Sequence, residues 1–216
     1  LNRFYAQPAC DTTMTSPSNM PNMLLKIDGK PYAPFLERLK IIYSAMDKKY
    51  QEAADYYNFH CSGCEDSCCF TRFYHHTLLE YLFIKEGYHT LVHEKKEAVR
   101  HRAFEVCRKT READEKGTPV RLMCPFNDNN LCLIYPYRPM ICRLHGIPHA
   151  LQRPGQGVLY SEGCEVFTKQ CQGKARFEFD RTPFYIKMAE LEKHLKQTVG
   201  MTQKIKMTVA QMVTTF

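Results

Sequence analysis

Cysteines are the residues of this chain whose types and spacing point most clearly to chemistry. Eight of them form two groups that are separated by sequence with helical patterning: Cys61, Cys64, Cys68 and Cys69 upstream, and Cys124, Cys132, Cys142 and Cys164 downstream. Ligands that are all thiolates select zinc or iron–sulfur clusters over magnesium or calcium. Eight cysteines could complete two four-thiolate centres. The sequence therefore predicts a metal-bearing core to which both groups contribute.

The spacing within the upstream group suggests more than one metal. Cys61 and Cys64 form a C-x-x-C pair, and Gly63 eases the tight turn between them. Cys68 and Cys69 are adjacent, and neighbouring side chains point apart in most backbone conformations. We therefore expect these two sulfurs to serve different metals, either in two centres or in one multinuclear cluster.

The choice of metal depends on how the cysteines are distributed. Zinc sites usually use paired C-x-x-C knuckles, and this chain has one such pair, whereas scattered single cysteines after a clustered run are more usual for iron–sulfur proteins. We expect an iron–sulfur cluster, of the 4Fe-4S type, with zinc as the alternative. A disulfide framework fits poorly, because the 11 cysteines are odd in number and the chain is long for a stapled domain.

Three residues near Cys142 are predicted to contact the bound cofactor. Arg138 and Arg143 flank this cysteine, and their guanidinium groups could offset the negative charge of a thiolate centre, or could instead form surface salt bridges. Tyr135 could donate a hydrogen bond to a sulfur, or simply pack.

The remaining cysteines and the histidines lie outside the two cysteine groups. Cys10 and Cys107 are isolated in sequence and are predicted not to be ligands, and Cys171 is a spare thiol. Histidines near the cysteines are more typical of polar loops, with His145, three residues after Cys142, as the strongest exception.

The cysteine pattern resembles that of the YkgJ family of cysteine-cluster proteins. The resemblance lies in the elements Cys61-x-x-Cys64-x-x-x-Cys68-Cys69, Cys124-Pro-Phe, Cys132-x-Ile-Tyr135 and Arg138-Pro-x-x-Cys142-Arg143, within residues 59–165. That family is described as zinc- or iron-chelating, and the resemblance implies that the eight clustered cysteines are ligands. The family more often has two residues, not three, before the paired cysteines. A relative, the flagellin lysine methylase, is an iron–sulfur protein that uses S-adenosylmethionine.

The elements that would position these cysteines are mainly helical. Apolar residues at steps of three and four predict helices over about 34–57, 77–86, 90–116, 183–199 and 202–212. Gly87, Gly117 and Gly200 are expected to end three of them. A turn signal at 153–157 predicts one short β-hairpin. We expect an extended arm over 1–31 and one metal-binding domain over 32–216, mainly α, with helices packed around a loop-rich, cysteine-ligated core at 59–171.

Charge and hydropathy restrict the partners. The net charge of +7 is moderate, and the basic residues at 100–111 alternate with glutamates as on an exposed helix, which disfavours nucleic acid. A protein partner or substrate is expected instead. The chain has no apolar run of membrane-spanning length and no secretory-signal pattern, so a reducing cytoplasm is the expected compartment.

Three functions stay open at this point. The first is an iron–sulfur protein with a redox or catalytic role, and the second is a zinc-stabilised binding module. The third, implied by the resemblance, is an S-adenosylmethionine-dependent enzyme like the protein lysine methylase. The sequence contains none of the G-x-G-x-x-G, Walker, G-x-S-x-G or H-E-x-x-H motifs, so whether the protein is an enzyme is open.

Overall fold

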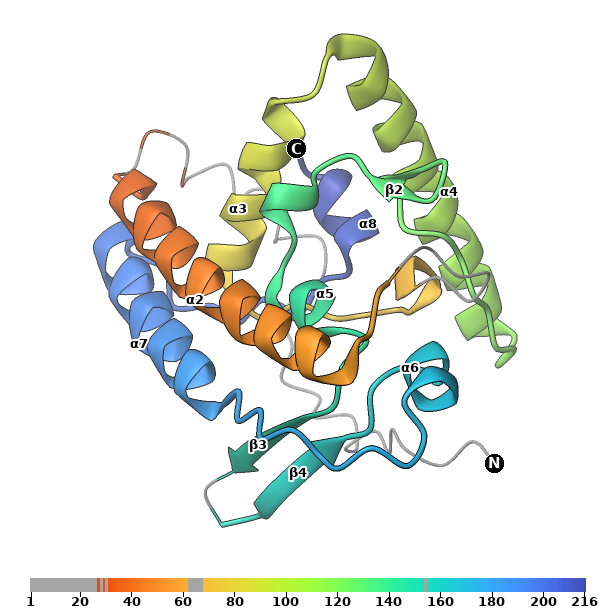
Figure 1. The fold of residues 1–216 in the computed structure, drawn as a ribbon. Coiled ribbons are helices and arrows are strands. Elements are labelled where there is room, and N and C mark those ends of the chain that lie inside the picture. The colour runs from red at the N-terminus through yellow and green to blue at the C-terminus, as the bar shows by residue number, and fades with distance from the viewer. Residues whose placement is uncertain (1–26, 28, 30, 62–67, 154) are drawn as a thin grey trace.

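The fold of the computed structural model is mainly helical, as the sequence predicts (Figure 1). The structure describes residues 27, 29, 31–61, 68–153 and 155–216, so most of the predicted N-terminal arm lies outside the described residues. The α-helices are α2 (Ala33–Tyr57), α3 (Leu78–His89), α4 (His93–Glu115), α5 (Met140–Leu144), α6 (Glu165–Gln170), α7 (Thr182–Val199) and α8 (Val209–Val213). The short 3-10 helices are η2 (Cys68–Phe70) and η3 (Tyr135–Tyr137). The strands are β1 (Asn127–Asp128), β2 (Leu131–Cys132), β3 (His149–Arg153) and β4 (Gly157–Ser161), which form two antiparallel hairpins.

Helices α2 and α7 lie side by side and form one wall of the molecule (Figure 1). Each has a proline in its first turn, where a fixed φ suits the helix and the missing N–H is no loss. Each ends at a left-handed residue, Asn58 for α2 and Gly200 for α7. The predicted apolar stripes are confirmed at their centres, since Leu39 and Met46 of α2 and Leu195 of α7 are fully buried.

Helix α3 does not end at Gly87, so that prediction is wrong. The helix continues to His89, and Gly87 is buried within it. A Cβ atom at Gly87 would lie only 2.6 Å from the Cβ of Tyr137 in η3. Glycine therefore serves here to let η3 approach the helix closely, which a local stop signal cannot reveal.

The C-terminal helix is shorter than predicted. Residues 202–208 are not helical, and the backbone of Met207 pairs with that of His75, with N–O distances of 2.8 and 3.1 Å. Helix α8 then begins after Thr208, whose side chain forms a capping box with Gln211. Pairing with a distant segment has overridden the local helical pattern.

The cysteine-rich region contains more regular structure than expected. Asn129 and Asn130, with φ of 51° and 65°, form the two-residue turn between β1 and β2. The predicted hairpin around 153–157 is confirmed as β3–β4, with Leu151 opposite Leu159. The region from β1 to β4 therefore consists of short elements that pack on the helical core, where Phe126 and Ile134 are buried.

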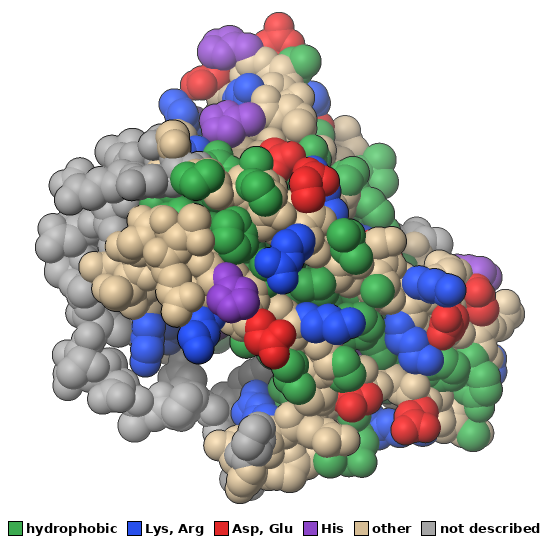
Figure 2. Space-filling model, turned by 90° about the vertical axis from the view of Figure 1, so that its left-hand side faces the viewer, with side chains coloured by type: hydrophobic (Ala, Val, Ile, Leu, Met, Phe, Trp, Pro, Cys, Tyr) green, Lys and Arg blue, Asp and Glu red, His purple; other side chains and the backbone are tan. Residues whose placement is uncertain are grey.

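Basic and acidic side chains are mixed over the described part of the face shown in Figure 2, so neither sign of charge dominates it. On α4, Arg108 pairs with Glu105 and Glu112, at N–O distances of 2.8 and 2.7 Å. Arg100 and Arg102 donate to backbone carbonyl groups. Within the described residues, no helix combines the length and apolar character needed to cross a membrane.

Candidate metal centre

The two cysteine groups meet in the fold. The N–H of Cys124 donates to the carbonyl oxygen of Cys69 at 2.9 Å, which joins the upstream and downstream stretches directly. Arg72 holds the segment after Cys69 to α4, because its guanidinium forms two hydrogen bonds of 2.8 Å with Asp114. Cys64 lies outside the described residues, so its predicted part in the metal-bearing core stays a prediction.

Four cysteines from different elements form one group, which we call the inner sulfur group: Cys69 in η2, Cys124 before β1, Cys132 in β2 and Cys142 in α5. Burial raises the pKa of Cys142 well above its ordinary value, and the charges of the other three thiolates raise it further. Burial also raises the pKa of Cys124 to about 12, with contributions from Cys69 and Cys132. The four sulfurs therefore lie within electrostatic range of one another in a poorly hydrated site.

Backbone donors face two sulfurs of the inner sulfur group. The N–H of Phe126 bonds to Cys124 and the N–H of Ile134 bonds to Cys132, and each bond lowers the pKa of its thiol, against the larger effect of burial. Donors of this kind favour the charged thiolate. Both donors are two residues after the cysteine that they contact. The local backbone is thus arranged to stabilise sulfur in its metal-binding form.

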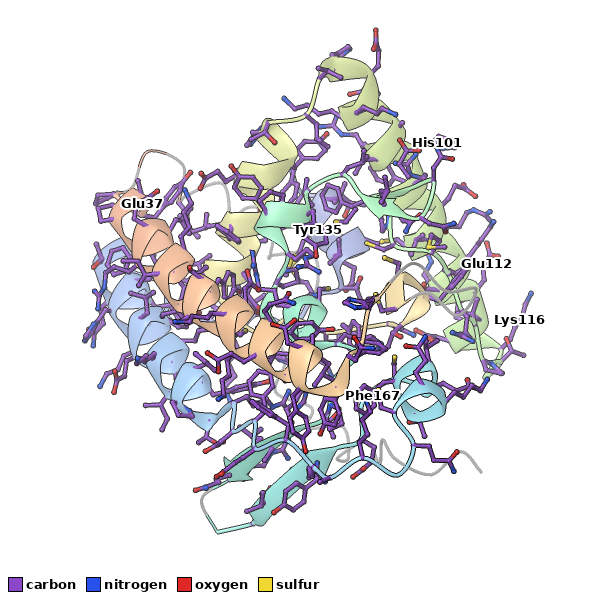
Figure 3. All side chains as sticks on the ribbon, in the orientation of Figure 1. Glu37, His101, Glu112, Lys116, Tyr135 and Phe167 are labelled. Atoms are coloured by element: carbon purple, nitrogen blue, oxygen red, sulfur yellow. The ribbon has the colours of Figure 1, made fainter. Side chains whose placement is uncertain are left out.

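A second pair of sulfurs, the outer sulfur group, comprises Cys61 and Cys164 near Tyr50 of α2. Burial raises the pKa of Tyr50, and the charges of both thiolates raise it further. The Tyr50 hydroxyl donates to the carbonyl oxygen of His145 at 3.1 Å. The N–H of Phe167 donates to the Cys164 sulfur at 3.4 Å, and Figure 3 shows Phe167 beneath the end of α2. The outer sulfur group therefore lies at the C-terminal end of α2.

Cys68 lies between the inner and outer sulfur groups. A hydrogen bond with the side chain of Cys69 raises its pKa most, followed by burial and by the charges of thiolates from both groups, Cys142 and Cys61. The expectation that the Cys68 and Cys69 side chains point apart is wrong. They sit on a 3-10 turn, where successive side chains do not alternate as they do along a strand.

The predicted cofactor contacts have different surroundings. Arg143 is buried, and its three donor nitrogens bond to Asp47 at 2.5 Å, to the carbonyl oxygen of Arg138 at 2.8 Å and to that of Pro136. These bonds stabilise the turn from η3 to α5, which carries Cys142. Arg143 therefore supports the site through the backbone. The charge of Arg138 lowers the pKa of Cys132 and Cys142, although burial outweighs it. Tyr135, labelled on η3 in Figure 3, is 58% exposed.

The guanidinium of Arg138 stacks on the Tyr135 ring, with its carbon 3.5 Å from the ring centre. Arg138 is therefore the predicted cofactor residue whose charge acts on the inner sulfur group, and Tyr135 orients it. Binding of a cofactor by these residues stays a prediction.

The candidate residues outside the two sulfur groups have other contacts. Cys107 lines an open groove of about 390 Å³ on α4 with Phe104 and Arg111. The Cys171 thiol donates to the carbonyl oxygen of Tyr57 at 3.7 Å. The ring of His145 packs edge-on against Phe73, at 5.9 Å between ring centres. Cys10 lies outside the described residues.

The chemistry of the inner sulfur group fits a metal–thiolate centre, although its thiols are not yet in coordinating positions. Among the described residues, no group of three or more His, Cys, Asp or Glu side chains has metal-binding spacing, so the sulfurs would have to draw together around an ion. None of the nine described cysteines is disulfide-bonded.

Arg102 of α4 is a half-buried cation that the sequence did not single out as part of the site. Its charge lowers the pKa of Cys124, against the larger effect of burial, and its Nε donates to the carbonyl oxygen of Pro125 at 2.8 Å. Its Nη2 is buried without a hydrogen-bond partner among the described residues. A buried donor of this kind calls for an acceptor, and an anionic metal–thiolate centre would supply one.

Comparisons with models of protein families, with curated proteins and with solved structures found no match. The resemblance to the YkgJ family and the identity of the ligands therefore stay predictions.

Proposed function

We propose that this protein is a cytoplasmic iron–sulfur protein with a redox or catalytic role. The observation that carries the proposal is the inner sulfur group, in which four half-buried cysteines from separate segments lie within electrostatic range of one another. Their sulfur-only chemistry suits iron–sulfur clusters or zinc and excludes hard cations such as magnesium. Cys69, Cys124, Cys132 and Cys142 would hold one cluster.

A second cluster would use the outer sulfur group. The cluster would be held by Cys61 and Cys164 of this group together with Cys68, and Cys64, predicted from sequence, would complete four ligands. Thiolates of both groups raise the pKa of Cys68, so the two clusters would lie next to each other. When bound, such clusters supply one-electron chemistry, which fits a protein partner or substrate.

Arg138 and Arg102 would offset the negative charge of the first cluster. Four thiolates around an iron–sulfur core leave a net negative centre, and two guanidinium groups already act on its sulfurs. Hydrogen bonds and positive charge near the sulfurs raise the reduction potential of such clusters.

The test is anaerobic purification followed by analysis of iron, acid-labile sulfide and zinc per chain. We expect iron and sulfide in similar amounts, together with a brown colour that bleaches on reduction. Cys107→Ser protein should give the same result, because Cys107 lies apart from both sulfur groups. Zinc without sulfide would overturn the iron–sulfur proposal and support a zinc-stabilised module.

Enzymatic activity of the methylase kind is an additional expectation from the resemblance. Its test is binding of S-adenosylmethionine to the metal-loaded protein, by calorimetry. Absence of binding would remove the methylase alternative but leave the cluster proposal unaffected.

A further inference from the structure

Glu80 is a buried carboxylate that the proposed centre does not use as a ligand. It is 6% exposed and lies in the first turn of α3. Thr77 caps that helix, since its hydroxyl accepts from the N–H of Glu80 at 3.2 Å. Thr77-x-x-Glu80 has the spacing of a capping box, in which the glutamate would turn back to the N-cap backbone.

The carboxylate of Glu80 instead reaches out of its own helix. Its Oε1 accepts from the N–H of Met140 at 3.0 Å and from the Tyr43 hydroxyl at 3.5 Å. Its Oε2 accepts from the Thr77 hydroxyl at 3.0 Å, and His75 Nδ1 lies 3.8 Å away. One carboxylate thus ties α3 to α2 and to the first residue of α5.

Another carboxylate satisfies the start of α3. Glu192 of α7 accepts from the N–H groups of Leu78 and Leu79 at 2.9 and 3.0 Å. The orphan donors at the N-terminus of α3 are therefore bonded without help from the Glu80 side chain. Glu192 is buried like Glu80, at 9% exposure, and its carboxylate bonds to the start of α3.

The contact with Met140 matters because of what α5 carries. Helix α5 has five residues, too few to be stable alone, and Cys142 is its third residue. Tyr43 is near both Glu80 and this cysteine, since burial, the Glu80 carboxylate and the Cys142 thiolate all raise its pKa. Fixing the first N–H of α5 fixes the direction in which the Cys142 sulfur leaves the helix.

The surroundings of Glu80 keep it an acceptor. Burial raises its pKa, but His75, the N–H of Met140 and the Thr77 hydroxyl lower it by a larger combined amount, so the net pKa lies below the ordinary value. An ionised carboxylate has no proton to donate and accepts from all these neighbours.

We propose that Glu80 is a positioning residue for the metal centre: it anchors the start of α5 so that the Cys142 sulfur faces Cys69, Cys124 and Cys132. The inference rests on the proposed thiolate centre. Without the hydrogen bond from Met140 to Glu80, α5 would be less ordered, and the Cys142 sulfur would no longer be held in position to bind metal.

The experiment uses cobalt(II) as a probe of the metal-free protein, because thiolate–cobalt absorption reports how many sulfurs bind. Glu80→Ala should bind cobalt about 10–100-fold more weakly, as for other supports of metal ligands, with a weaker thiolate–cobalt band. Glu80→Gln keeps an oxygen acceptor for Met140 and should retain most of the wild-type affinity and spectrum. If Glu80→Ala does not fold, Glu80→Asp, with a shorter reach, takes its place and should show the same weakening.

Glu192→Ala is the matched control. It removes a buried, helix-capping carboxylate of the same kind, so it should lower the thermal midpoint while leaving the cobalt affinity and spectrum unchanged. Equal losses of cobalt binding in Glu80→Ala and Glu192→Ala, or no loss in the Glu80 variants, would overturn the role of Glu80. Failure of the wild-type protein to form a thiolate–cobalt band would instead overturn the proposed metal centre.

Discussion

Cys124 shows how a single residue links burial, charge and stability. Burial, together with the thiolates of Cys69 and Cys132, raises the pKa of this thiol to about 12. The fold therefore favours the protonated thiol, and this contribution is present below about pH 8.5, the pKa of an ordinary cysteine in an unfolded chain. It is lost as the pH rises from there toward 12.

The metal-free protein should accordingly lose stability in alkali. We expect the free energy of unfolding, measured with urea, to fall progressively between pH 8.5 and 12. In Cys124→Ala protein the fall should be smaller, because one of the thiols with a raised pKa is absent. An identical pH dependence in both proteins would contradict the burial of this thiol.

Serine substitutions test the members of the inner sulfur group. Cys132→Ser and Cys142→Ser should each reduce the iron content by about one cluster per chain, since a four-thiolate centre rarely tolerates loss of a ligand. Cys107→Ser, which replaces another half-buried thiol, should leave the iron content unchanged. A loss of iron in the folded Cys107→Ser protein would contradict the assignment of ligands.

At the scale of elements, the contact between α3 and η3 depends on the lack of a side chain at Gly87. Alanine in a helix interior normally stabilises by about 1 kcal/mol relative to glycine. At Gly87, however, the new Cβ would meet the Tyr137 side chain at 2.6 Å. We expect Gly87→Ala to destabilise the protein by about 1–3 kcal/mol, as overpacked cores do, in urea unfolding.

A double-mutant cycle isolates this contact. In a Tyr137→Gly background both the Cβ atom and the ring of residue 137 are absent, so adding Gly87→Ala should cost much less than it does in the wild-type background. Equal costs in the two backgrounds would show that the close approach of η3 to α3 does not limit the substitution.

At the scale of the whole molecule, the dependence on metal should be uneven. Helices α2 and α7 bury continuous apolar stripes and pack on each other, whereas the region from β1 to β4 consists of short elements, none longer than five residues. Metal removal should therefore speed hydrogen exchange in about 68–75 and 120–165 and leave α2 and α7 protected.

Low pH should have the same effect as metal removal, because protons compete with metal for the thiolates and metal is lost as the pH falls. Hydrogen exchange followed by mass spectrometry measures both cases. Unchanged protection of 120–165 after metal removal would mean that the fold is complete without metal.

Local signals in the sequence determined much of the helical framework. The repeating apolar pattern, the prolines at the starts of α2 and α7 and the glycine after α7 act within one or two turns, so they could be interpreted without knowledge of the rest of the chain. The hairpin β3–β4 was equally accessible, because its turn residues specify the connection. The cysteine spacing likewise determined which residues could be metal ligands.

The tertiary structure alone decided how these parts meet. The division of the cysteines into inner and outer sulfur groups, with Cys68 between them, depends on the contact between segments that are distant in sequence. The same holds for Gly87, whose role follows from Tyr137, and for Glu80, whose carboxylate leaves its own helix for α5. Each of these roles depends on a neighbour brought by the fold, and periodicity and spacing describe only neighbours along the chain.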